Sequence, residues 1–141
     1  MHRLYWVIAI IQTLRAVYAL TLLGLALMHR AGLLEMSGAI SQFVLGLPSH
    51  LLVIWIAYVT AYGVAAGLIW LRRAEAVYVF CGAFAIDLGL WVYSSLGHNY
   101  QASFAGYASL VDMVFNVIDF GLLTGLLLLL RSGALHRSSR S

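Results

Sequence analysis

The chain has 141 residues, of which 63% are hydrophobic and only 9% carry a charge. A soluble domain of this size would have about a quarter of its residues charged. Polar side chains are therefore too few to cover a water-soluble globule, which excludes that class and makes lipid the expected solvent. The net charge of +3 is small, so we expect the lipid bilayer and no nucleic acid among the partners.

Four apolar runs follow one another along the chain, at residues 4–28, 51–71, 76–96 and 109–130. Each is long enough to cross about 30 Å of hydrocarbon as a helix, which satisfies its own backbone hydrogen bonds in lipid. The alternating pattern of barrel strands does not occur in the sequence. The sequence therefore predicts an all-α fold, namely a polytopic membrane protein with four transmembrane helices in an antiparallel bundle.

The whole of residues 1–131 is expected to form one membrane domain, followed by a flexible cytoplasmic tail over residues 132–141. The first apolar run is longer than the core of a signal peptide, so it is predicted to be a retained span. The orientation follows from the arginines that flank the spans. Arg30 alone lies on one side, and the other side holds Arg3, Arg72, Arg73, Arg131, Arg137 and Arg140. Because positive loops stay in the cytoplasm, both termini are predicted to be cytoplasmic, in a membrane of the bacterial inner (plasma) membrane type.

The outer segment between the first two spans, residues 31–49, is partly apolar. Its apolar side chains recur at helical spacing: Leu33, Met36, Ile40, Phe43 and Leu47. This pattern predicts a short helix that lies in the membrane interface and is ended by Pro48. The sequence leaves open whether the segment is interfacial or re-entrant.

The last span carries polar side chains that a simple lipid anchor would not contain. Asp112, Asn116 and Asp119 lie at i, i+4 and i+7, so they share one stripe of a helix. Arg15 and Asp87 lie near the middle of the first and third spans, at the same depth as Asp119. A charge that faces lipid is costly, so we expect Arg15, Asp87 and Asp119 to face inward and to meet.

One guanidinium cannot neutralise two carboxylates. Since Arg15 stays charged in any surroundings, we expect one aspartate to be ionised beside it and the other to be protonated or to exchange a proton. The sequence leaves open which of Asp87 and Asp119 is the protonated one. Asn116 and Asp112 would extend this intramembrane polar cluster toward the outer surface. Such a cluster can lock the register of helices or hold a subunit in a larger complex, and the alternative is a transport or proton-relay site.

Two glycine pairs have the small-xxx-small spacing of closely packed membrane helices. They are Gly63 with Gly67 in the second span and Gly121 with Gly125 in the last. The spacing predicts close helix packing, either inside the protomer or in a homo-oligomer.

Three histidines, His29, His50 and His98, fall at the outer ends of spans and are the only weak candidates for metal ligands. Their spacing matches no ligand motif, so we predict no metal site and no cofactor. Cys81 has no second cysteine to pair with and is interpreted as a packing residue. No nucleophile motif or phosphate-binding loop is present in the sequence, so we expect the protein not to be an enzyme.

Two functional hypotheses follow. The first is a non-catalytic subunit, assembly factor or scaffold of a membrane complex, which would dock on other membrane proteins. It is favoured by the missing catalytic motifs and by helices with more than one interaction face. The alternative is a small proton- or cation-coupled transporter or channel in which Asp87 and Asp119 are the titrating groups and Arg15 is their fixed counter-charge.

Overall fold

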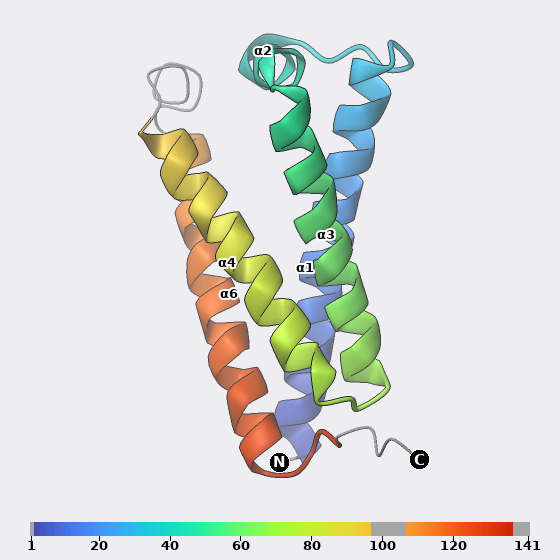
Figure 1. Cartoon of the computed structure of the whole chain (residues 1–141), viewed down its shortest axis with the longest axis vertical. Coiled ribbons are helices and arrows are strands. Elements are labelled where there is room, and N and C mark those ends of the chain that lie inside the picture. The colour runs from blue at the N-terminus through green and yellow to red at the C-terminus, as the bar shows by residue number, and fades with distance from the viewer. Residues whose placement is uncertain (1, 97–106, 137–141) are drawn as a thin grey trace.

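The computed structural model describes residues 2–96 and 107–136 (Figure 1). In these residues the chain is all-helical, as predicted. Its helices are α1 (His2–Arg30), α2 (Gly38–Gly46), α3 (Ser49–Trp70), α4 (Glu75–Ser95) and α6 (Tyr107–Arg131). Of these, α1, α3, α4 and α6 are long and apolar enough to cross a membrane. The prediction of a multi-pass membrane protein with four apolar spans is therefore confirmed at this level. The single-domain assignment stays a prediction.

The long helices contact one another in a ring. α3 packs against α1 and α4, and α6 packs against the same two helices. Figure 1 shows that the helices lie close together at the end that holds the N-terminus and separate toward the end that carries α2. At the α2 end, α4 and α6 lean away from α1 and α3. The two ends of the molecule are therefore packed differently.

The core is continuous at the end opposite α2, which we call the base. Its large, fully buried side chains are Tyr62, Ile69, Phe80, Leu126 and Leu129. Tyr62 and Ile69 lie seven residues apart on α3, and Leu126 and Leu129 lie three apart on α6, so each of these helices contributes one face to the core. In the described residues, the buried side chains of α4 end at Phe84 and those of α6 begin at Asp119. Beyond those positions the second buried cluster of the described residues joins α1 and α3, through Ala19, Leu23 and Val59. α6 still contacts α1 there through the stacked rings of Phe115 and Tyr18.

A tight turn joins α3 to α4 at the base. Arg72 adopts a φ of 53° there, in the left-handed region. The chain that follows α6 pairs with this turn, since His136 donates its backbone N–H to the Arg72 carbonyl over 2.7 Å. In return, the Ala74 N–H donates to the His136 carbonyl over 2.9 Å. The turn and the end of α6 are thus joined by backbone hydrogen bonds.

The boundary of the tail differs from the sequence-based expectation. Gly133, at a φ of 71°, ends α6, and the next N–H, of Ala134, donates to the Leu129 carbonyl over 3.1 Å. Leu135 is buried in the core. Residues 132–136 are therefore part of the base, whereas residues 137–141 of the expected flexible tail lie outside the described residues.

The predicted outer helix is present but shorter than its apolar pattern. Gly32 and Gly38 both have a positive φ, of 74° and 78°, so helical geometry is interrupted after α1 and again at the first residue of α2. Leu33 and Met36 consequently lie in non-helical chain. The helix ends at Gly46, and Pro48 stands at the N-cap position of α3 rather than ending α2.

Two side chains at the end of α1 hold α2 in place. Arg30 Nη1 donates to the Leu47 carbonyl over 2.8 Å and to the Val44 carbonyl over 3.5 Å. A positive charge is favourable at these carbonyls because the C-terminus of a helix is the negative end of its dipole. His29 Nε2 lies 2.8 Å from Ser41 Oγ. Arg30, which the sequence analysis placed apart from the other flanking arginines, thus caps the C-terminus of α2.

Candidate functional site: a buried charge cluster beneath a cavity

The charged residues in the middle of three different helices meet, as predicted. Arg15 Nη2 on α1 donates to Asp119 Oδ2 on α6 over 2.9 Å and to Asp87 Oδ2 on α4 over 3.1 Å. Arg15 Nε donates to Asp119 Oδ1 over 3.1 Å, so Asp119 receives the guanidinium in a two-point contact. A buried Arg–Asp cluster is therefore present.

A tyrosine completes this cluster from the fourth long helix. The Tyr62 hydroxyl on α3 lies 3.1 Å from Asp119 Oδ2 and 3.3 Å from Asp87 Oδ2, as their hydrogen-bond donor. Its ring also lies under the guanidinium, with Arg15 Cζ 4.9 Å from the ring centroid. Phe115 places a second ring centroid 5.0 Å from Arg15 Cζ. All four long helices thus contribute to one interaction network.

The two carboxylates differ in their access to the surface. The Asp119 side chain is only 1% exposed and takes three of the hydrogen bonds from Arg15. The Asp87 side chain is 20% exposed and takes one. Asp87 is therefore the carboxylate that a small molecule or ion from outside the core would meet first.

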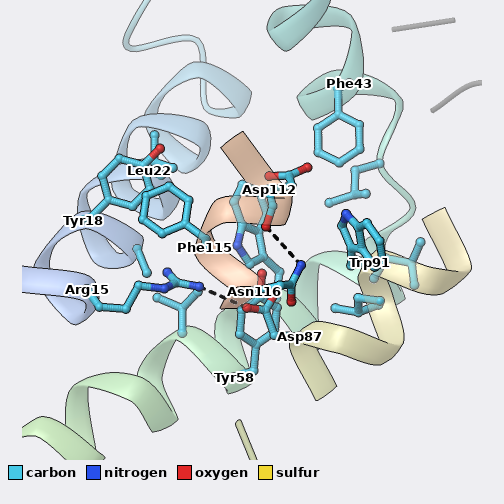
Figure 2. A pocket seen from close by; sticks show the side chains of 16 residues that line it. Arg15, Tyr18, Leu22, Phe43, Tyr58, Asp87, Trp91, Asp112, Phe115 and Asn116 are labelled. Carbon is cyan, nitrogen blue, oxygen red and sulfur yellow. Dashed lines mark hydrogen bonds and ion pairs between the residues drawn. The ribbon is translucent and has the colours of Figure 1, made fainter. Parts of the chain in front are cut away.

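Asp87 is reached through a cavity of about 230 Å³ on the α2 side of the cluster (Figure 2). All five described helices, together with the chain that joins α2 to α3, supply its walls. Figure 2 shows Arg15 and Asp87 on one side of the cavity and Phe43 of α2 on the opposite side. The cavity is thus bounded by the charge cluster at one end and by α2 at the other.

The walls combine aromatic rings with polar groups. The aromatic side chains are Tyr18, Phe43, Trp55, Tyr58, Trp91 and Phe115. Asp112 and Asn116, which the sequence places on the Asp119 stripe, also line the cavity. The Asn116 amide donates to the main-chain carbonyl of Asp112 over 3.0 Å, which fixes its orientation. The polar stripe of α6 therefore runs from the cluster into the cavity.

The predicted glycine positions separate into two kinds. A Cβ on Gly125 would meet Ile8 of α1, with Ile8 Cγ1 only 3.1 Å away, so this glycine allows α1 and α6 to approach closely. Gly63 faces Leu20 of α1 at an ordinary distance of 3.5 Å. A Cβ on Gly67 or Gly121 would have nothing within 4 Å. Half of the small-xxx-small positions therefore lie on outer surfaces of this protomer.

The weak metal candidates are not brought together in the part of the chain that the structure describes. His29 has both ring nitrogens engaged, because its Nδ1 lies 2.8 Å from the Leu34 carbonyl and its Nε2 contacts Ser41. His50 is exposed at the start of α3, and His98 lies outside the described residues. Within residues 2–96 and 107–136, no three His, Cys, Asp or Glu side chains are placed to hold a metal ion.

Sequence reasoning assigned no role to two polar residues of the interior. Tyr62 lies at the depth of Asp119, but a tyrosine in a span is also common at interfaces, so its depth alone did not indicate a carboxylate contact. Gln12 is fully buried, and its amide donates to the Tyr62 carbonyl over 3.4 Å. It precedes Arg15 by three residues, and this shared helix face is the signal that would have revealed it.

Comparison with protein-family models, with curated proteins and with solved structures finds no match for this chain. Its function has to be argued from the cavity and the charge cluster themselves.

Proposed function

We propose that the chain is a small cation- or proton-coupled membrane transporter. In this proposal the cavity is the access path, Asp87 and Asp119 are the titrating groups, and Arg15 is their fixed counter-charge. The observation that carries it is the cavity that ends at Asp87, a carboxylate already ion-paired with Arg15. With both termini in the cytoplasm, as the arginine distribution favours, the cavity would open on the outer face.

The cluster supports such a role because its carboxylates compete for shared donors. Arg15 Nη2 and the Tyr62 hydroxyl each approach one oxygen of Asp87 and one of Asp119. A hydroxyl has one proton and can serve only one carboxylate at a time. A proton or cation that arrives at Asp87 can replace the shared donors there, which leaves Arg15 and Tyr62 to Asp119 alone.

The same exchange would change how the helices are held together. α1 and α4 are not adjacent in the ring of helix contacts, so the Arg15–Asp87 pair joins them across the interior. Neutralising Asp87 weakens that link without removing the two-point contact between Arg15 and Asp119. A change of charge at the cavity is thereby coupled to the separation of α4 from α1, which is the kind of two-state element that transport requires.

The test is ion flux into proteoliposomes that contain the purified chain. We expect a proton or cation flux in the wild-type protein and a loss of at least about tenfold in Asp87→Asn, since the amide does not take up a proton and lacks the negative charge that attracts a cation. Glu35→Gln is the matched control, because Glu35 is an exposed acid on the α2 side. A wild-type protein without flux, or an Asp87→Asn protein that transports normally, would contradict the proposal.

A second candidate is the non-catalytic subunit of a membrane complex. The observation in its favour is the open surface at Gly67 and Gly121, where another membrane helix could approach closely. This role predicts a stoichiometric partner that co-purifies in mild detergent and is lost in Gly121→Leu, together with no flux in the intact protein. Neither role requires catalytic residues, and we propose that the chain is not an enzyme.

A further inference from the structure

We propose that the ligand of this cavity is an organic cation, namely a positively charged nitrogen group attached to a small apolar body. The charged group would lie between Asp87 and Asp112, and the apolar body would pack among the aromatic walls. This inference rests on the proposed function in one respect, since it takes the cavity to be the site that receives the transported solute.

The charge of the cavity favours a cation. Among the residues that the structure describes, its lining contains one guanidinium, from Arg15, and two carboxylates, from Asp87 and Asp112, and Asp119 pairs with Arg15. The four groups sum to a formal charge of −2 when all are ionised. The positive charge of Arg15 is already directed at Asp119 through three hydrogen bonds. An anion would therefore meet two carboxylates and an engaged guanidinium, whereas a cation would reduce the excess negative charge.

The aromatic walls favour the same class of ligand. A cation within about 6 Å of a ring face is attracted by the negative face of the π system. The cluster already demonstrates this arrangement, because the Arg15 guanidinium lies 4.9 Å and 5.0 Å from the centroids of Tyr62 and Phe115 while it contacts two carboxylates. One or two helical turns further toward α2, the cavity lining again contains aromatic rings and a carboxylate, namely Trp55, Trp91 and Asp112.

The size of the cavity limits the ligand. A cavity of about 150 Å³ accommodates one benzene ring. The volume of about 230 Å³ found here leaves room for such a ring and a small ammonium group. A monocyclic aromatic ammonium ion is therefore the appropriate probe.

Equilibrium dialysis of the full chain in nanodiscs of uncharged phosphatidylcholine tests the inference. We expect benzyltrimethylammonium to bind, and benzyl alcohol and benzenesulfonate to bind at least about tenfold more weakly, because they lack the charge that the carboxylates attract. Protein-free nanodiscs correct for partitioning into lipid. Benzyltrimethylammonium should also quench Trp55 and Trp91 in a chain that carries Trp6→Phe and Trp70→Phe, which places the ligand in the cavity.

Substitutions in the cavity walls show how much of the affinity for benzyltrimethylammonium comes from the carboxylates and how much from the aromatic rings. Asp87→Asn and Asp112→Asn should each weaken binding of benzyltrimethylammonium by about tenfold, and Asp112→Asn keeps the test open if the other variant does not fold. Trp55→Leu should weaken binding by about 2- to 30-fold, whereas Trp55→Phe, which keeps a ring, should lose less. Glu35→Gln, an exposed acid outside the cavity lining, should bind like the wild type.

The outcomes separate this inference from the proposed function. Equal binding of the cation and benzyl alcohol, or undiminished binding in Asp112→Asn, would overturn the inference. Cation binding that depends on Asp112 in a protein without flux would support the inference and refute transport. Proton flux that depends on Asp87, without any binding of benzyltrimethylammonium, would support the proposed transport and overturn the inference of an organic cation.

Discussion

The base and the α2 end of this protein are built from the same faces of α4 and α6. At the base these faces pack into a closed core, whereas at the α2 end they line a cavity. At the base, Val77, Phe80 and Phe84 of α4 are buried against the core. One or two turns further along the same face, Asp87 and Trp91 line a cavity. α6 makes the same change at Asp119, on whose two sides lie Leu122 in the core and Asn116 in the cavity lining.

The difference shows what the charge cluster does in the fold. All four long helices meet through their side chains at the cluster, and beyond it the buried apolar residues of the described chain join only α1 and α3, while α6 contacts α1 through the Phe115 and Tyr18 rings. The cluster therefore closes the base and forms the floor of the cavity. The closely packed part of the fold and the cavity are thereby separated along the length of the helices.

The largest expected effect is the loss of the shared cation. Arg15→Met leaves Asp87 and Asp119 beside each other without a counter-charge, and we expect the free energy of unfolding to fall by about 3–5 kcal/mol. Unfolding in mixed micelles at increasing SDS, followed by circular dichroism, measures this.

The triple variant Arg15→Met, Asp87→Asn, Asp119→Asn is the control for charge. It should recover part of the loss, because the destabilisation comes from uncompensated carboxylates rather than from the missing side chain. A triple variant as unstable as Arg15→Met alone would show that the cluster acts through packing instead.

A smaller loss is expected for the hydroxyl that serves both carboxylates. Tyr62→Phe removes a donor to charged acceptors and should lower the free energy of unfolding by about 1.5–3 kcal/mol, while the ring under Arg15 is kept. Tyr18→Phe is the matched control, because Tyr18 is 40% exposed and its ring stacks on Phe115. Equal stability of the two variants would mean that the Tyr62 hydrogen bond adds nothing to the floor.

The close approach of α1 and α6 at the base can be tested by substituting Gly125, with Gly121 as the control. Gly125→Val places methyl groups against Ile8 and should cost about 1–3 kcal/mol, and Ile8→Ala should relieve part of this cost in the double variant. Gly121→Val, one turn away and open, should leave the stability of the protomer nearly unchanged. A similar loss in both glycine variants would indicate that a second chain covers Gly121.

The parts of this structure that the sequence predicted depend on lipid as a solvent. Long apolar runs have to be helical there, and Arg15, Asp87 and Asp119 have to meet because none of them can face acyl chains alone. The cavity has no such signal. Asp112, Phe115 and Asn116 continue the spacing of the buried face of α6, and periodicity cannot tell a core from the wall of a cavity.

The sequence also contained no signal for backbone hydrogen bonds between distant segments. The hydrogen bonds between His136 and the turn at Arg72 join segments far apart in the sequence, although Gly133 after Arg131 did carry the local signal for the end of a helix. The length of α2 was overestimated for a different reason. Its apolar pattern extends back to Leu33, but the positive φ of Gly38 ends the helical geometry.

The smallest expected effect is confined to the α2 end. Arg30→Ala removes the cap at the Leu47 carbonyl, and a charge at a helix C-terminus contributes about 0.3–1 kcal/mol. Amide hydrogen exchange in α2 should therefore become about 2- to 5-fold faster, while exchange at Ile69 and Leu129 in the base should not change. Because α2 supplies Phe43 to the cavity, this variant loosens a wall without touching the floor. Faster exchange in the base as well would show that the two ends unfold together, and the contrast between a closed base and a responsive cavity would then not describe this protein.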